Sequence, residues 1–276
     1  MNKFYAKNTP QKNIINNMNS YYHQNQIFDI DHFNLLKPAI SMWPARHQLL
    51  FDGWVLRFFY PYFNRCNCIY TLEKGRLDIH QKIRKCEQLY SQNHYGFVFQ
   101  ILPQFSILDN YLQKKGYRKC QQTRWMSIAL NKKKFFLDHA IEYCSIQPSK
   151  DWLVCRQTIA GYSEKEAEIY KKFHRTITAT KYPFIYQKNQ RPVACGLGLQ
   201  VDNCLGIFDV HTRIDNRRQG YARSLVQMIM RHAQNNGATY AQLHVDINNN
   251  AAIQLYQGLG FQLICDYWFR TLTDSI

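Results

Sequence analysis

Residues 210–222 are typical of a phosphate site, because a branched stretch that predicts a strand leads through a short loop into a helix. The first N–H groups of a helix have no partner within it and lie at the positive end of its dipole, so they attract anions. Gly220 and Ala222 leave space for a pyrophosphate beside the main chain. Arg217 and Arg218 add positive charge. For this segment taken alone, a glycine-containing loop before a surface helix, without a ligand, is the alternative.

A second motif follows the predicted helix. It has the order Asn-x-Ala-Ala-x-x-Leu-Tyr-x-x-x-Gly-Phe and comprises Asn249, Ala251, Ala252, Leu255, Tyr256, Gly260 and Phe261. Together with the Arg-x-x-Gly-x-Ala loop, it resembles the GNAT superfamily of acetyl-CoA-dependent N-acetyltransferases, and the resemblance covers residues 145 to 273. The resemblance implies an α/β (α+β) fold with a strongly bent mixed sheet flanked by helices. In that fold, the fourth and fifth strands splay apart and admit the pantetheine arm of acetyl-CoA.

The resemblance also implies which residues hold acetyl-CoA. The backbone of residues 210–212 would pair with pantetheine, and the main chain of residues 217–222 would hold the pyrophosphate. Asn249 would fix either the cofactor or, as a helix cap, the start of the last helix. The implied cofactor-binding residues are Val210, His211, Thr212, Arg217, Arg218, Gln219, Gly220, Tyr221, Ala222, Asn249 and Tyr256.

Acetyl transfer to an amine needs a base for the amine and a proton donor for the departing thiolate. Tyr256 stands where the family often places a phenol near the CoA sulfur, so the resemblance implies that it is the donor, with a packed aromatic ring as the alternative. Asp209 is the first candidate for the base, with a solvated carboxylate at the strand end as its alternative, and His211 and His244 are the other candidates for the base. Because Asp209 and Val210 face opposite ways on an extended strand, only one of them lines a given face of the sheet. Backbone N–H groups near Val210 would polarise the thioester carbonyl.

Alternating strands and helices must position these residues. Ser163, followed closely by two glutamates, predicts a helix N-cap. After the first 145 residues, the predicted strands span residues 152–158, 184–187, 192–200, 205–212, 240–245 and 262–271, and the predicted helices span 163–175, 219–235 and 249–257.

The first half shows a similar order of elements. Its predicted strands span residues 54–60, 66–72, 96–102 and 123–130, and its predicted helices span 32–43, 79–92 and 107–115. When Gly116-Tyr117 is set on Gly260-Phe261, Leu112 falls where Tyr256 stands, and no Arg-x-x-Gly-x-Gly/Ala loop precedes it. We therefore expect a tandem GNAT protein with a degenerate domain over residues 1–140 and a catalytic domain over residues 141–276.

The first domain is expected to pack on the second and to shape its acceptor cleft. The candidates for this role are Trp43, Trp54, Arg57 and Arg65. Burial in a hydrophobic core is the alternative for both tryptophans. The boundary between the domains is expected near residues 131–145, where a basic polar patch interrupts the elements.

Composition narrows the class of protein. The 276 residues are 46% hydrophobic and carry a formal charge of +16, which is typical of a folded, basic protein. No apolar run is long enough to span a bilayer and residues 1–26 lack a signal-peptide core, so we expect a cytoplasmic protein with no membrane partner. Nine cysteines without a Cys-x-x-Cys pair predict reduced thiols, and no metal site is expected.

These observations predict an enzyme that moves acetyl from acetyl-CoA to a primary amine of a small molecule by direct attack on the thioester. A protein or peptide acceptor is the alternative within the same chemistry. A non-catalytic module that binds acyl-CoA or a polyanion is the alternative from another class. Nucleic acid is not the expected partner, because no nucleic-acid-binding motif accompanies the basic first half.

Overall fold

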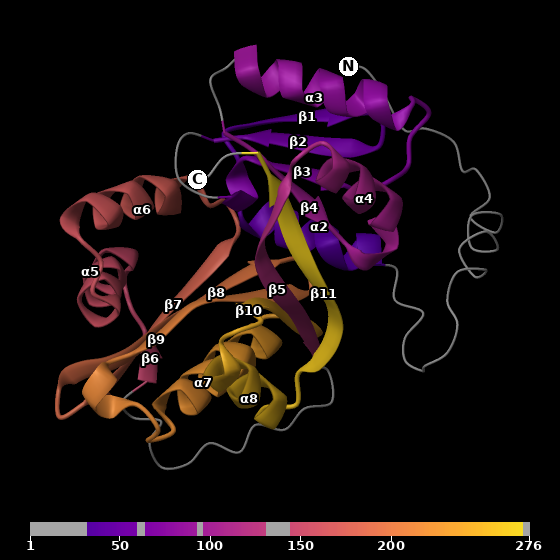
Figure 1. Cartoon of the computed structure of the whole chain (residues 1–276). Helices are drawn as coiled ribbons and strands as arrows, with labels where there is room; N and C mark the ends of the chain where they lie inside the picture. The colour runs from indigo at the N-terminus through magenta and orange to yellow at the C-terminus, as the bar shows by residue number, and fades with distance from the viewer. Residues whose placement is uncertain (1–31, 60–63, 93–95, 131–143, 273–276) are drawn as a thin grey trace, which may run out of the picture. The chain divides into compact units, whose positions relative to one another are not determined.

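The computed structural model describes residues 32–59, 64–92, 96–130 and 144–272. The described residues form a mixed sheet of eleven strands in the order β1-β2-β3-β4-β11-β5-β10-β9-β8-β7-β6 (Figure 1). The first half contributes α2 (His32–Met42), β1 (His47–Phe51), β2 (Trp54–Phe58), β3 (Cys68–Thr71), α3 (Ile79–Gln92), β4 (Val98–Ile101), α4 (Ser106–Lys114) and β5 (Arg118–Ala129). The second half contributes β6 (Cys144–Ile146), α5 (Ser149–Ala160), α6 (Glu164–Thr176), β7 (Thr180–Lys188), β8 (Arg191–Val201), β9 (Cys204–Thr212), α7 (Tyr221–Asn235), β10 (Tyr240–Asp246), α8 (Asn250–Gly258) and β11 (Gln262–Thr271).

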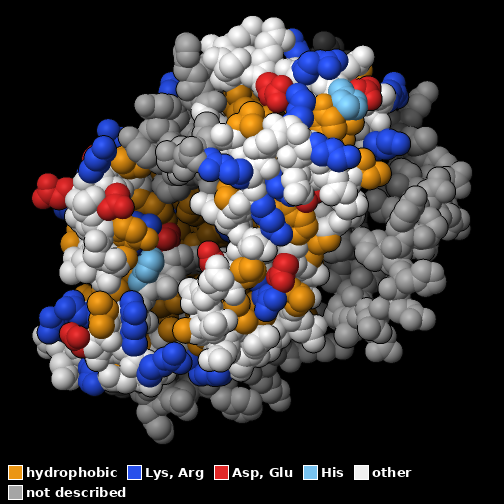
Figure 2. All heavy atoms as spheres, viewed as in Figure 1, with side chains coloured by type: hydrophobic (Ala, Val, Ile, Leu, Met, Phe, Trp, Pro, Cys, Tyr) orange, Lys and Arg blue, Asp and Glu red, His pale blue; other side chains and the backbone are white. Residues whose placement is uncertain are grey.

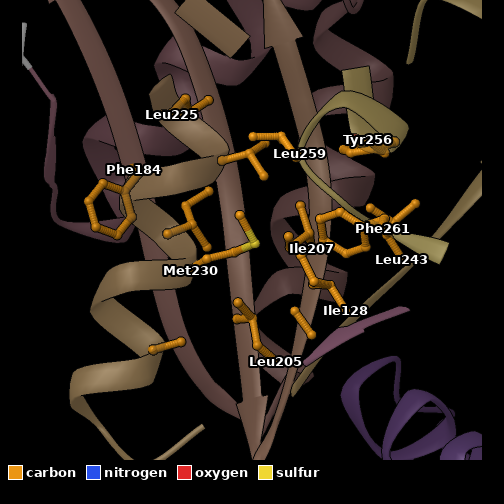
Figure 3. Packing of buried hydrophobic residues seen from close by; sticks show 14 of the residues in the cluster. Ile128, Phe184, Leu205, Ile207, Leu225, Met230, Leu243, Tyr256, Leu259 and Phe261 are labelled. Atoms are coloured by element: carbon orange, nitrogen blue, oxygen red, sulfur yellow. The ribbon is translucent and has the colours of Figure 1, made fainter. Parts of the chain in front are cut away.

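Helices cover both faces of the second half of the sheet. Helices α7 and α8 pack on one face around Leu225, Met230 and Tyr256 (Figure 3). Helices α5 and α6 pack on the other face, where Trp152 and Phe173 are fully buried. These layers confirm the predicted α/β class of the fold.

The two halves of the chain repeat the same topology. In each half, antiparallel strands lead to a parallel pair joined through a helix, β3-α3-β4 in the first and β9-α7-β10 in the second. A second helix and a long strand follow in both. The N–H of Tyr117 donates to the carbonyl of Leu112 at 2.9 Å, and the N–H of Phe261 donates to the carbonyl of Tyr256 at 3.0 Å. This turn confirms that Leu112 takes the place of Tyr256 in the first copy.

Each half contributes its last strand to the other half of the sheet. Strand β5 of the first half lies between β10 and β11 of the second, and pairs with both in antiparallel register (Figure 1). The far end of β11 lies between β4 and β5 of the first half. The sheet is therefore continuous through an exchange of strands. The expected domain boundary near residues 131–145 stays a prediction, because residues 131–143 lie outside the described part of the chain.

Several predicted elements need correction. Residues 152–158 were expected to form a strand, but they lie within helix α5. The buried residues of this helix are Trp152, Cys155 and Arg156, which recur at helical spacing, and Gly161 ends it with a positive φ of 74°. Strands β1 and β6 were not predicted. The predicted N-cap Ser163 of α6 is confirmed, and the structure shows that it forms a capping box with Glu166.

No described helix combines the length and the apolar character needed to cross a membrane. All nine cysteines are free thiols. In the described part of the chain, no group of three or more His, Cys, Asp or Glu side chains is arranged to hold a metal ion.

Candidate functional site

Strands β9 and β10 separate after a short parallel pairing. Only Cys204–Gly206 of β9 and Tyr240–Gln242 of β10 are paired, although β9 continues to Thr212 and β10 to Asp246. The N–H of Arg213 donates to the carbonyl of Val193 on β8. By the alternation of an antiparallel ladder, the N–H groups of Val210 and Thr212 then point away from β8, into the opening between the strands. The predicted splay of the fourth and fifth strands of this half is confirmed.

The loop between β9 and α7 presents its backbone to solvent. Gly220 is the N-cap of α7 with a positive φ of 85°, and the helix has no side-chain cap. A Cβ at Gly220 would meet no atom within 4 Å, so there is space beside the backbone. Residues 217–220 are all exposed. An anion at this helix start would meet backbone donors at the positive end of the dipole, as a pyrophosphate requires.

A bulge in β9 places Asp209 on the α5 and α6 face of the sheet. The register between β8 and β9 shifts at this point, and Asp209 has a φ of 49°. Val210 packs with α7 in the opposite core. The two side chains therefore lie on opposite faces, as the strand pattern predicted.

Asp209 is held in a buried network of charged and aromatic groups. Arg156 of α5 forms an ion pair with it at 3.1 Å, and Tyr170 of α6 donates a hydrogen bond to the other carboxylate oxygen. The Arg156 guanidinium lies 3.5 Å from the centre of the Tyr170 ring. Burial raises the pKa of Asp209, but the interactions with His211, Arg156 and Tyr170 outweigh burial and lower the pKa to about 2. Asp209 is therefore a carboxylate at neutral pH and accepts a proton poorly.

His211 lies beside this carboxylate. Its Nε2 is 3.7 Å from Oδ1 of Asp209, and its ring meets that of Tyr162 edge to face. Nε2 has no hydrogen-bond partner within the residues that the structure describes. The arrangement pairs an imidazole with a fixed carboxylate at the edge of the opening.

His244 lies across the opening, on β10. Its ring stacks on Trp125 of the exchanged strand β5, with 5.3 Å between the ring centres, and its Nδ1 is 3.2 Å from the hydroxyl of Tyr267. Burial and the charge of Arg65 lower the pKa of His244 well below the usual histidine value. A neutral imidazole with one nitrogen already engaged is less suited to accept the amine proton than His211.

Tyr256 lies on α8 and packs in the core between α7, α8 and the sheet (Figure 3). It is 8% exposed and its ring meets Phe261 edge to face at 5.7 Å. Burial raises the pKa of Tyr256 to about 12, so its phenol carries a proton at neutral pH. No described residue forms a hydrogen bond with its hydroxyl group.

Asn249 caps helix α8. Its Oδ1 accepts a hydrogen bond from the N–H of Ala252 at 3.1 Å. The helix-cap alternative for Asn249 is confirmed. A contact with the cofactor stays a prediction.

The first half reaches this site through Trp43. Its ring stacks on Phe208 of β9 at 5.2 Å and meets Phe173 of α6 at 4.6 Å. Trp54, the other candidate tryptophan, is 3% exposed within the core of the first half, so the core alternative holds for it. Figure 2 shows the surface hollowed between the part that carries α5 and α6 and the part that carries β5 and β11, with hydrophobic side chains inside the hollow.

Arg156 and Tyr170 were missed from the sequence. Arg156 lies four positions after Trp152, on the buried face of α5. A charged residue on the apolar face of a helix is the signal that could have identified it, but the interpretation of this segment as a strand concealed that face.

Comparisons with known proteins agree with this geometry. Residues 148–261 match the model of the acetyltransferase (GNAT) family. The chain is 23% identical over 239 residues to the uncharacterized N-acetyltransferase YobR of Bacillus subtilis (strain 168), covering 84% of this chain and 95% of that protein.

Solved structures show the same fold at low identity. A GCN5-related N-acetyltransferase from Kribbella flavida has a TM-score of 0.67 at 14% identity, covering 87% of this chain and 94% of the other. A tandem GNAT protein from the clavulanic acid biosynthesis pathway has a TM-score of 0.56 at 10% identity, covering 81% and 79%. With the splayed strands and the open helix start in place, the family match shows that residues 148–261 form an acetyltransferase domain of the GNAT family.

Proposed function

We propose that the protein transfers acetyl from acetyl-CoA to a primary amine of a small molecule by direct attack on the thioester. The observation that carries this proposal is the opening between β9 and β10 below the uncapped start of α7, within the segment that matches the family. The family implies the use of acetyl-CoA.

The residues of the opening fit the cofactor. The open space at Gly220 suits a pyrophosphate held by the main chain of residues 217–222, with Arg217 and Arg218 supplying positive charge. The inward N–H groups of Val210 and Thr212 suit the amide groups of a pantetheine arm and the thioester carbonyl. Bound acetyl-CoA supplies an activated acetyl group.

Two side chains, His211 and Tyr256, would transfer the protons that acetyl transfer requires. His211 would accept the proton of the amine through Nδ1, while its buried Nε2 faces the carboxylate of Asp209, which stabilises the imidazolium and orients the ring. Asp209 would thus act through His211, because its own pKa of about 2 makes it a weak base. Tyr256 would give its phenolic proton to the departing thiolate, since it is protonated and has no competing partner among the described residues.

We also propose a cytoplasmic location. Nine free cysteines support it, because thiols in secreted proteins are usually oxidised in pairs.

Thiol release from acetyl-CoA in the presence of an amine panel tests the proposed activity, and calorimetry tests cofactor binding separately. We expect binding without any amine and release only with a primary amine. Binding without release for small amines and peptides alike would instead favour a non-catalytic acyl-CoA-binding module. Release with peptides alone would favour the protein or peptide acceptor.

A further inference from the structure

Two arginines of the first half, Arg57 and Arg65, have no carboxylate partner among the described residues. Arg57 is 1% exposed, and its guanidinium donates to the carbonyl groups of Arg65, at 3.0 Å, and of Trp43. The Nε of Arg57 is buried with no hydrogen-bond partner in the described part of the chain. Arg57 is thus enclosed, and its two bonds hold the backbone of Arg65 and Trp43 in place.

Arg65 is linked to the second half through Tyr267. Its guanidinium donates to the Tyr267 hydroxyl at 3.3 Å, and that hydroxyl also lies 3.2 Å from Nδ1 of His244, where the direction of the bond depends on the histidine tautomer. In the tautomer whose Nδ1 accepts from Tyr267, His244 carries its proton on Nε2, and this nitrogen has no hydrogen-bond partner among the residues described. In that tautomer, the guanidinium of Arg65 and the Nε2–H of His244 are two donors joined by one hydroxyl group.

These donors lie on the same face of the sheet as Asp209. Leu243 and Val245 of β10 pack with α7 and α8, so His244 between them points to the opposite face, where α5 and α6 lie. Gln242, on that same face of β10, reaches the Cys204 thiol of β9. The donors and the Asp209–His211 pair thus stand on opposite sides of the opening.

An aromatic stack adjoins this space. Trp43 and Phe208 are both partly exposed, and their rings lie within 20° of parallel. Arg57 fixes the backbone of Trp43 through the bond to its carbonyl group. The apolar part of an acceptor would contact this stack.

We propose that the acceptor is a primary amine that also carries an anionic oxygen group, a carboxylate or a phosphate, bound by Arg65 and His244 while the amine faces His211. This inference rests on the proposed function. It gives the exchanged strands and the first half a role in choosing the acceptor, since Arg65 and Trp43 come from the first half and Tyr267 from the exchanged strand β11.

Matched pairs of amines test the inference on the full chain with acetyl-CoA. The pairs are phenylalanine with phenethylamine, 4-aminobutanoate with butylamine, and phosphoethanolamine with ethanolamine. We expect kcat/KM to favour the anionic member by about 10-fold or more in at least one pair, because hydrogen bonds between charged groups are among the stronger ones. The amino acid pairs and the phosphate pair distinguish which anion is bound.

Arg65→Ala should reduce that preference by about 10-fold, mainly by raising KM, and Arg65→Lys should retain part of it because the charge remains. Arg76→Ala removes an exposed arginine of the same half and should leave the preference unchanged. Turnover with no preference, or a preference unaffected in Arg65→Ala, overturns the anion site alone. Absence of turnover with every amine, despite bound acetyl-CoA, overturns the proposed function as well.

Discussion

At the scale of single residues, Tyr256 has the simplest test. Its phenol is protonated at neutral pH because burial raises its pKa to about 12. Tyr256→Phe keeps the ring against Phe261, so acetyl-CoA affinity and melting temperature should change little. Turnover should fall about 100-fold if the phenol is the proton donor. Unchanged turnover would leave Tyr256 as a packed aromatic, and a parallel loss of affinity would make it a binding residue.

Gly220 tests the cofactor site. A carboxylate in Gly220→Asp would occupy the open space at the start of α7 and repel the pyrophosphate, so calorimetry should detect no acetyl-CoA binding. Gly237→Asp is the matched control, because Gly237 also has a positive φ and open space at its Cβ, but lies after the other end of α7. Normal affinity in a folded Gly220→Asp protein would remove the assignment of this loop.

The residues of the site differ in how far the sequence could predict them. The loop at Gly220 and the cap at Asn249 belong to local motifs, in which chemistry and spacing lie within one short segment. The network of Arg156, Tyr170 and Asp209 joins two helices and a bulged strand. No local pattern contains that network, because its members meet only when α5, α6 and β9 pack together.

At the scale of elements, variants of Asn249 distinguish two roles of this residue at the start of α8, the helix cap and a contact with the cofactor. Its side chain caps the helix, so Asn249→Ala should lower the free energy of unfolding by about 1 kcal/mol in urea titrations. Asn249→Asp keeps an acceptor oxygen and should restore stability. If affinity for acetyl-CoA falls in both variants, Asn249 also contacts the cofactor.

The strands and helices were predicted where a pattern is confined to one element. The ends of α3 and β11 agree with the predicted 79–92 and 262–271, because a clear helical period marks α3 and a run of aromatic residues marks β11. Helix α5 was mistaken for a strand, because a short apolar run with aromatic and branched residues is compatible with either a strand or a buried helix. The partners of β5 and β11 could not be predicted, because pairing between distant segments leaves no local trace.

The helix start of the first copy differs from that of α7. The Asp52 carboxylate accepts the N–H groups of Arg76 and Leu77 at 2.8 and 2.9 Å, and Asp78 accepts that of His80. A Cβ at Gly75 would lie 2.2 Å from the carbonyl oxygen of Asp52. The N–H groups that a pyrophosphate would need already donate to negatively charged carboxylates. The space that it would need is filled by Asp52.

We accordingly expect the chain to bind one acetyl-CoA. Isothermal titration should give one site per chain, and Gly220→Asp should abolish the whole signal, which shows that the site belongs to the second half. Two equivalent sites, or a site that survives Gly220→Asp, would mean that the first copy still binds the cofactor.

At the scale of the whole molecule, the exchanged strands make the two halves depend on each other. Strand β10 pairs with β5 over Tyr240–Asp246, and β11 pairs with β4 at Trp268–Arg270, within the stretch that also pairs with β5. Removal of either half would leave long strands with unpaired edges and expose the apolar faces that now pack against the other half. The halves should therefore fold as one unit, although they repeat one topology.

Thermal unfolding of the intact chain tests this dependence. We expect one transition in which the calorimetric and van't Hoff enthalpies agree, because neither set of strands can separate without breaking the pairs of β5 and β11. Trp125→Phe gives a second test, since the indole N–H of Trp125 on β5 donates to the side chain of Gln242 on β10 at 2.8 Å. Loss of that buried bond should lower the single melting temperature without splitting the transition. Two separate transitions, with only one of them shifted in the variant, would show instead that the halves are independent domains that merely share an edge.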